Sequence, residues 1–314
     1  MLTRRHIRVK VLQSLYAYQN QDKANLVKQE KFLVYSMEQM HDLYLLLLHL
    51  MTAIHTQAEG YMEKSKRKHL ATSLEITPNR NFIDNRVLAL LTENNSLNIL
   101  LKNKKITNWE VDNEYPQILF KEIRQGELYA NYLKLVNPTF QQDKEFIVTL
   151  YSEIIAPNEK LYSYLEDHSL TWIDDFPIVN TAIVKMLNQL KPTTKEDKLV
   201  PKLYKNDDDR DFAVDLFNKT VLQNTNLLAE IEGKTPNWDK ERIAELDLIL
   251  IKMGITEFLH FPSIPVKVTI NEYLEIAKEY STPKSSLFIN GILDKLVKEY
   301  MENNKLNKIG RGLQ

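Results

Sequence analysis

Three arginines near the start of the chain have the type and spacing for contact with a polyanion. Arg4, Arg5 and Arg8 fall in the first two turns of a helix for which Thr3 is a suitable N-cap. The positive end of the helix dipole disfavours cations there by ~0.3–1 kcal/mol each, and none of the first ten residues is acidic. A phosphate backbone would offset both the dipole and the mutual repulsion. The alternative, which stays open, is a solvated, frayed terminus.

Further candidates lie near the other end of the chain. The run from Thr269 to Glu272 fits a capping box that begins a helix. Thr282 and Pro283 predict a second start, with an N-cap followed by proline at the first helical position. Phe288 lies at the edge of the apolar stripe of that last helix. It is either a peripheral core residue or an aromatic that stacks an unpaired base.

The helix predicted over residues 241–259 is apolar almost all round, which indicates a buried, central helix. Asp247 and Lys252 stand out within it as charged residues. Each is either paired at the rim of the helix or marks the place where a partner docks.

Composition limits the classes of protein that remain. The chain has 314 residues, 43% of them hydrophobic and 26% charged, with seven glycines, no cysteine and a net charge of −1. The low glycine count favours helices. Without cysteine, disulfides, thiolate nucleophiles and cysteine-based zinc sites are excluded. The balanced charge means that any nucleic-acid role rests on a local patch.

Signals for catalysis, export or membrane insertion are missing from the sequence. The seven histidines show no metal-ligand spacing, and neither a nucleophile elbow nor a phosphate-binding loop is present. We therefore expect no enzyme activity, no metal and no cofactor. The longest apolar run, residues 43–48, is far shorter than the ~20 residues of a membrane span. With no secretory signal, a cytoplasmic location is expected.

The helical period dominates the organisation of the chain. It predicts a helix over residues 5–20, one long helix or two broken near Gly60 over residues 24–70, and shorter helices over residues 86–136. Residues 77–85 and 191–209 are polar, and the second stretch is typical of a linker between two halves.

The two halves carry similar segments. The run Asp143-Lys144-Glu145-Phe146 recurs as Asp209-Arg210-Asp211-Phe212 at a shift of 66 residues, and Trp172 recurs as Trp238. One interpretation makes residues 143–190 a degenerate copy of residues 209–253 that serves as scaffold. The other is chance agreement between amphipathic helices.

The run RRHIRVKVLQSLYAYQ, and the run IPVKVTINEYLEIAKEY followed by LFINGILDK, resemble the first helix and the carboxy-terminal signature of the NusB family of transcription antitermination factors. The resemblance covers residues 4–20 and about 209–300. It implies an all-α fold, in which residues 1–20 and 205–302 form a NusB-like helical bundle. Residues 21–204 are then a helical insertion, and residues 303–314 a flexible tail.

The same resemblance implies binding of the boxA element of ribosomal RNA leader transcripts, together with the ribosomal protein NusE. Contact with the RNA polymerase elongation complex is then indirect. Carried over by position, the RNA-binding residues are Arg4, Arg5, Arg8, Lys252, Lys267, Lys284 and Phe288. Tyr16 and Asp247 fall at positions that face NusE. Lys284 departs from the family, which often has an acid there, and a lysine should strengthen phosphate contact.

Two other classes of function are alternatives to this interpretation. One is a helical scaffold that lost RNA binding, against which the retained arginines count. The other is an accessory domain linked to ribosomal RNA methylation, but such methyltransferases need a glycine-rich cofactor sheet and a catalytic cysteine. The basic run Lys64-Ser65-Lys66-Arg67-Lys68 is either a solvated helix end or an extension of the RNA surface.

Overall fold

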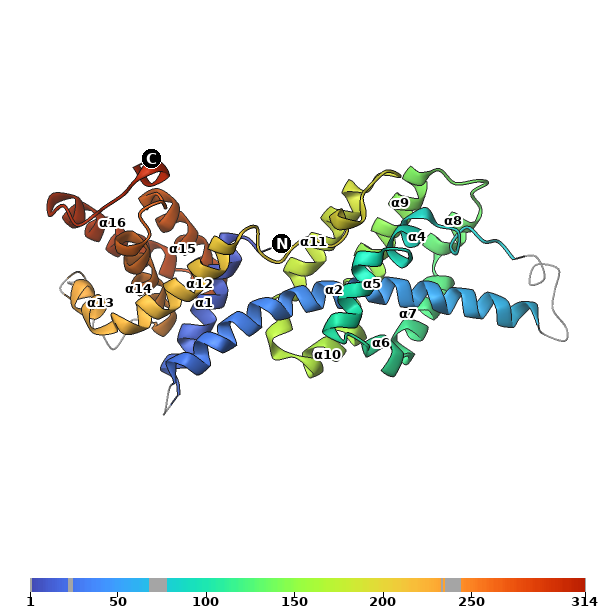
Figure 1. Cartoon of the computed structure of the whole chain (residues 1–314), viewed down its shortest axis with the longest axis horizontal. Helices are drawn as coiled ribbons and strands as arrows, with labels where there is room; N and C mark the ends of the chain where they lie inside the picture. The colour runs from blue at the N-terminus through green and yellow to red at the C-terminus, as the bar shows by residue number, and fades with distance from the viewer. Residues whose placement is uncertain (1, 22–24, 68–77, 233, 235–243, 314) are drawn as a thin grey trace. The chain divides into compact units, whose positions relative to one another are not determined.

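The computed structural model describes residues 2–21, 25–67, 78–232, 234 and 244–313, and every regular element in these ranges is helical (Figure 1). The predicted all-α fold is confirmed. The chain divides into two compact units. Unit 1 holds residues 38–203, and unit 2 holds residues 2–37 together with residues 204–314. One division lies within α2 (Leu26–Lys66), and the other lies inside the polar stretch 191–209.

Unit 2 is built around one buried helix. Its elements are α1 (Arg4–Gln19), the start of α2, α12 (Asp207–Leu222), α13 (Asn224–Ile231), α14 (Glu245–His260), α15 (Val266–Tyr280) and α16 (Ser285–Glu302). α14 contacts α1, α12, α13, α15 and α16. Every residue from Ile249 to Phe258 is buried, as the apolar sequence predicted. The predicted start at Glu241 lies outside the described residues, as does Trp238.

The first helix of unit 2 begins where the sequence predicted. The Thr3 side chain accepts a hydrogen bond from the His6 backbone N–H at 3.3 Å, so the N-cap is confirmed. Two other predicted starts were wrong. α15 begins at Val266, which places Thr269 inside the helix. α16 begins at Ser285 rather than at a proline, because residues 282–285 form a turn that precedes the helix.

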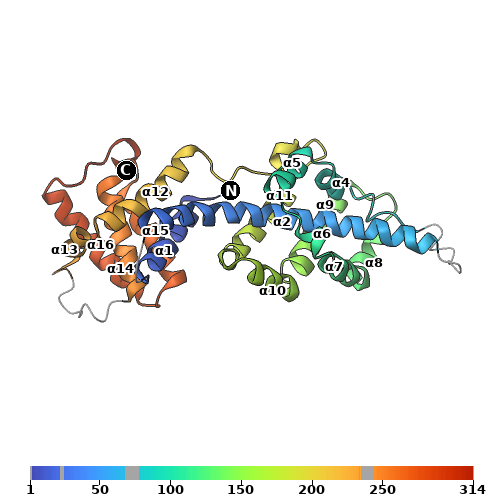
Figure 2. The same cartoon turned by 60° about the horizontal axis from the view of Figure 1, so that its bottom comes forward.

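Unit 1 packs short helices against the longer part of α2 (Figures 1 and 2). α2 is one continuous helix through Gly60 rather than two. The other elements are α4 (Arg86–Thr92), α5 (Asn95–Lys104), α6 (Asn108–Val111), α7 (Glu114–Gln125), α8 (Glu127–Leu133), α9 (Phe140–Leu150), the π-helical turn η1 (Tyr151–Ile155), α10 (Glu159–His168), η2 (Leu170–Trp172), α11 (Phe176–Gln189) and η3 (Glu196–Lys198).

The apolar run 43–48 explains why α2 is central to unit 1. All six residues are buried. Indole and phenol groups hold the helix in place: Trp109 Nε1 donates to the Leu46 carbonyl at 2.9 Å, and the Tyr44 hydroxyl donates to the Leu199 carbonyl at 2.8 Å. The apolar side chains therefore supply the core, and the hydrogen bonds fix the position of the helix.

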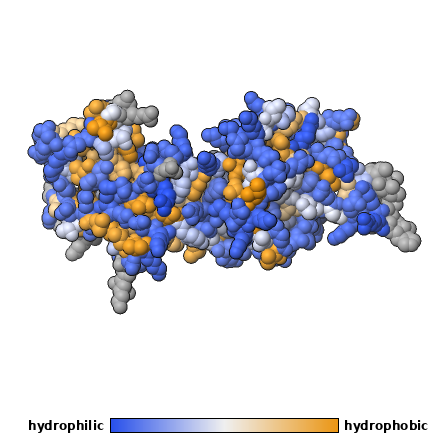
Figure 3. Space-filling view, viewed as in Figure 1, coloured by the Kyte–Doolittle hydropathy of each residue, from blue (hydrophilic) through white to orange (hydrophobic). Residues whose placement is uncertain are grey.

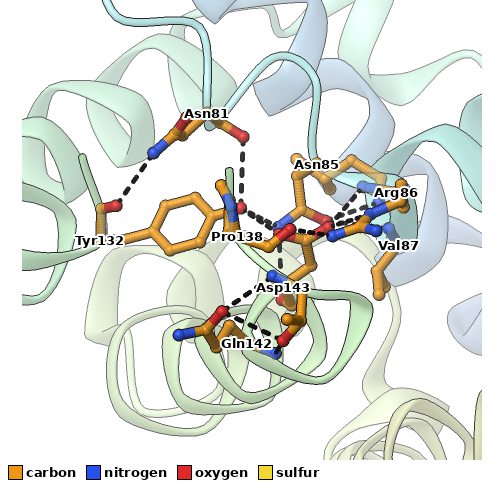
Figure 4. Close-up of polar contacts among 10 residues, drawn as sticks. Asn81, Asn85, Arg86, Val87, Tyr132, Pro138, Gln142 and Asp143 are labelled. Atoms are coloured by element: carbon orange, nitrogen blue, oxygen red, sulfur yellow. Dashed lines mark hydrogen bonds and ion pairs between the residues drawn. The ribbon is translucent and has the colours of Figure 1, made fainter. Parts of the chain in front are cut away.

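A buried carboxylate joins α4 to α9 in unit 1 (Figure 4). Asp143 is 1% exposed and accepts hydrogen bonds from the Tyr132 hydroxyl and from Arg86 Nε, both at 2.7 Å. The Asn85 side chain donates to the Asp143 carbonyl at 3.2 Å. The Tyr132 ring in turn stacks on Phe146, with 3.9 Å between ring centres. The cluster is thus both hydrogen-bonded and packed.

Residues 303–313, expected to be a flexible tail, contact unit 2. The Ile309 N–H donates to the Pro262 carbonyl at 3.1 Å, and Lys308 Nζ donates to the Glu257 and Phe261 carbonyls at 3.3 and 3.1 Å. The segment therefore supplies partners for the carbonyls at the end of α14.

The surface carries hydrophobic residues in small groups among hydrophilic ones on the face seen in Figure 3. Within the described ranges, each helix is too short or too polar to pass through a bilayer.

Candidate nucleic-acid interface

The three arginines of α1 each meet a carboxylate of unit 2. Arg4 Nε lies 2.7 Å from Asp209 Oδ1 on α12, and its guanidinium lies 4.3 Å from the centre of the Phe212 ring. The Arg4 side chain remains 38% exposed. It is thus held by an ion pair and a cation–π contact without being buried.

Arg5 pairs with α15. Its Nε and Nη2 atoms donate to Glu272 at 3.0 and 2.8 Å in a bidentate arrangement. These hydrogen bonds raise the pKa of Arg5 and lower the pKa of Glu272. Glu275 and Glu279 also act on Arg5 electrostatically. A phosphate that approaches Arg5 therefore meets acidic side chains of α15.

Arg8 belongs to the core. Its side chain is 2% exposed, and its Nε and Nη2 atoms donate to Glu257 at 2.9 and 2.6 Å. Thr269 and Tyr273 hydroxyls donate to the same carboxylate at 2.7 and 3.1 Å. Burial lowers the pKa of Arg8, but the Glu257 carboxylate outweighs burial and raises it. The result is a fully partnered ion pair between α1, α14 and α15.

These contacts correct both interpretations of the arginines. The charges are offset by internal carboxylates, so their placement needs no external polyanion to explain it. The terminus is not frayed either, because α1 begins at Arg4 behind a formed cap. Arg8 does not reach the surface and leaves the candidate RNA face.

Lys252 is also buried, with only 3% of the residue exposed. It lines a cavity of about 610 Å³ beside Tyr18 and Asn224. Burial lowers the pKa of Lys252, and Glu245 partly offsets this effect. Lys252 therefore faces a space between helices rather than an open surface.

The remaining RNA candidates lie on the surface of unit 2. Lys267 is exposed in the first turn of α15, and Lys284 is exposed directly before α16. Phe288 is half-buried one turn further along α16. Beside it, Leu287 is 77% exposed, a residue that the sequence analysis did not single out. Basic and apolar groups thus meet at the start of α16.

The two residues assigned to the partner protein differ in placement. Tyr16 is 43% exposed on α1 and available for contact. Asp247 is 5% exposed and accepts hydrogen bonds from the Ser281 and Ser285 hydroxyls at 2.6 and 2.7 Å. Asp247 therefore ties α14 to the connection between α15 and α16. Its replacement by lysine would remove both hydrogen bonds, so Asp247 matches the alternative of a paired charge rather than that of a docking charge.

The sequence analysis did not identify the acids that pair with the arginines, which are Asp209, Glu257 and Glu272. The pairing of Glu257 could have been predicted from the sequence, because a carboxylate within a helix that is apolar all round needs a buried partner. The described residues hold no group of three histidine, aspartate or glutamate side chains arranged for a metal ion.

Comparison with known proteins identifies the carboxy-terminal region. Residues 177–298 match the model of the NusB family. The transcription antitermination protein NusB of Salinibacter ruber is 43% identical over 104 residues, 33% of this chain and 65% of that protein. The NusB of Chloroherpeton thalassium is 40% identical over 104 residues, covering 33% of this chain and 49% of that protein.

A third relative, the NusB of Koribacter versatilis, is 40% identical over 90 residues, 29% of this chain and 62% of that protein. The chain thus spans less than two thirds of the length of each of these relatives. No solved structure matches the chain significantly. The same 104 residues are a third of this chain but about two thirds of the Salinibacter protein, so this chain is the longer of the two. Residues 177–298 of this chain form a NusB-family domain.

Proposed function

We propose that this chain is a transcription antitermination factor that binds boxA-like single-stranded RNA together with NusE. The observation that carries the proposal is the NusB-family domain, which includes α14, α15 and α16. Three relatives with 40–43% identity over this region bear the name of transcription antitermination protein. The chain then contacts the RNA polymerase elongation complex indirectly, by way of NusE.

The RNA face that we propose is smaller than the set of seven residues expected from the sequence. Lys267 and Lys284 are exposed cations without an ion pair among the described residues. Phe288 lies one turn beyond Lys284, where an unpaired base can stack while the lysine meets a phosphate. Arg4 and Arg5 contribute only by sharing their guanidinium groups between the internal carboxylates of Asp209 and Glu272 and the RNA phosphates. Tyr16 is proposed to contact NusE.

One observation favours a second candidate, a helical interaction scaffold without RNA binding. All three α1 arginines already have carboxylate partners. If the three arginines serve only to form these ion pairs, their presence in α1 does not support RNA binding. The exposed Tyr16 and Leu287 would then serve protein contacts alone.

A binding experiment separates the two candidates. Labelled boxA-like RNA and a scrambled RNA are titrated with the full chain, with and without NusE. We expect preference for boxA that strengthens with NusE, and equal, weak binding of both RNAs would exclude the proposal in favour of the scaffold.

Two double variants locate the face. Lys267→Glu with Lys284→Glu should weaken boxA binding by about tenfold or more, because phosphate contacts are lost and repulsion is added. The matched control is Lys28→Glu with Lys31→Glu, which changes two exposed lysines of α2 in the same unit. Equal losses in both double variants would remove Lys267 and Lys284 from the interface.

A further inference from the structure

We infer that a groove between α2 and α7 in unit 1 binds single-stranded RNA. The α2–α7 groove encloses about 310 Å³ and is lined by Gly60, Tyr61, Lys64, Phe120, Lys121 and Arg124, together with two glutamines. Both views of the chain show α7 beside the later part of α2 (Figures 1 and 2). The groove lies outside residues 177–298, so it goes beyond the function proposed for the NusB-family domain.

The Tyr61 ring and the Arg124 guanidinium lie against each other in this groove and form a stacking platform. The guanidinium carbon of Arg124 lies 3.9 Å from the centre of the Tyr61 ring, and Tyr61 meets Phe120 edge-on at 5.9 Å. Tyr61 is 42% exposed. RNA bases stack on aromatic rings and on arginine guanidinium planes, so the platform offers both kinds of surface.

Cations from two helices converge beside the platform. Lys64 lies one turn beyond Tyr61 on α2, and Lys121 lies one turn before Arg124 on α7. Both lysines are exposed, and neither has a hydrogen bond or ion pair with another described residue. The described residues that line the groove include no acid. The positive charge is therefore left for an anionic ligand, as a phosphate backbone would be.

The geometry favours a nucleic acid over an acidic protein. A second basic cavity of unit 1, about 580 Å³, is lined by four lysines, Lys185, Lys191, Lys195 and Lys198, but by no aromatic residue. An acidic peptide needs only such charges. The α2–α7 groove adds the stacking platform that flat bases use. A Cβ built on Gly60 would meet no atom within 4 Å, so the groove is open at the α2 backbone.

The test uses the full chain and a short labelled oligouridylate, followed by fluorescence anisotropy at several salt concentrations. Lys64→Glu with Lys121→Glu should weaken binding by about tenfold or more and reduce the salt slope. The matched control, Lys102→Glu with Lys160→Glu, changes two exposed lysines of unit 1 outside the groove and should bind like the parent chain. Equal weakening in both would show unspecific charge and overturn the inference.

The tyrosine variants test the platform separately. Tyr61→Ala should weaken binding roughly 5- to 150-fold with little change in salt slope, while Tyr61→Phe should retain it. Circular dichroism confirms that each variant is folded. Unchanged binding in Tyr61→Ala, or binding of polyglutamate but not of the RNA, would overturn the inference. The outcome is separate from the boxA test, because the groove variants are measured on oligouridylate, whereas the Lys267 and Lys284 variants are measured on boxA-like RNA.

Discussion

The starts of α1 in unit 2 and α4 in unit 1 are held in the same way. Each helix begins with an arginine behind a side-chain cap, Arg4 behind Thr3 and Arg86 behind Asn85. Each arginine meets an aspartate at 2.7 Å, Arg4 with Asp209 on α12 and Arg86 with Asp143 on α9. These aspartates are the residues that the shift of 66 matches.

The helix contacts follow the same pattern. α1 packs on α12, and α12 on α14, while α4 packs on α9, and α9 on α11. A phenylalanine three residues after each aspartate packs nearby, Phe212 against Arg4 and Phe146 against Tyr132. We propose that unit 1 contains a degenerate copy of the unit 2 helices. The shared arginine and aspartate support this interpretation over chance.

The difference between the regions lies in the buried ion pair. When α1 and α4 are aligned at Arg4 and Arg86, Arg8 of α1 corresponds to Leu90 of α4. The one-residue slip that aligns the α11 region with α14 places Leu190 at the position of Glu257. Leucine therefore stands at both aligned positions, with Leu90 half-buried and Leu190 buried. A buried pair is costly to break from one side but can be exchanged for apolar residues on both sides. Both units thus have the helix-start pair, whereas the aligned residues of unit 1 have no counterpart of the buried Arg8–Glu257 pair.

Breaking the core pair from one side should have the largest effect. Arg8→Leu leaves Glu257 buried without its cation and should cost about 3–5 kcal/mol in unit 2. Hydrogen exchange of α14 amides measures the loss. Arg8→Leu combined with Glu257→Leu, which copies the aligned residues of unit 1, should cost less than the sum of the single changes. Strict additivity would contradict the comparison.

The helix-start pairs should differ in strength. Asp143→Ala leaves the Tyr132 hydroxyl and Arg86 without their buried acceptor and should destabilise unit 1 by ~2–3 kcal/mol. Asp209→Ala should destabilise unit 2 by only about 1 kcal/mol, because Asp209 is less buried than Asp143 and accepts from the Lys205 backbone rather than from a buried hydroxyl. Exchange of α4 and α1 amides reports each effect. Equal losses of stability in the two variants would mean that the burial of Asp143 does not strengthen its interactions.

The smallest effect concerns pH. Unit 2 has the Arg5–Glu272 pair where the alignment gives unit 1 the apolar Val87. The folded-state pKa of Glu272 lies below the unfolded value of 4.5, so the pair stabilises above that pH and loses its effect as the pH falls through the folded pKa. Glu272→Gln should lower the free energy of unfolding by less than about 1 kcal/mol at pH 7, seen as a small decrease in Tm, and should have no such effect at acid pH. A decrease of equal size at both pH values would point to packing instead.

Sequence periodicity was sufficient to predict the helical class and the burial of α14, and the residue type of Thr3 was sufficient to predict the N-cap. These features depend on neighbouring residues. The partners of the arginines could not be predicted this way. Arg8 and Glu257 are separated by 249 positions, and Arg5 and Glu272 by 267. For the same reason Thr269 was predicted to be an N-cap, although its hydroxyl donates a hydrogen bond to the Glu257 carboxylate. Local patterns identify charged residues but not the distant groups that neutralise them.

Crosslinking tests the central claim, RNA contact by the α15 and α16 surface of the NusB-family domain, most directly. The full chain with NusE is photocrosslinked to a boxA-containing RNA with a single-stranded extension, and the attached peptides are identified by mass spectrometry. We predict crosslinks at Lys267 and around Lys284 and Phe288, with further crosslinks at Tyr61 and Lys121. Crosslinks confined to the lysine cavity at Lys185, Lys191, Lys195 and Lys198, with none in α15 or α16, would contradict the account.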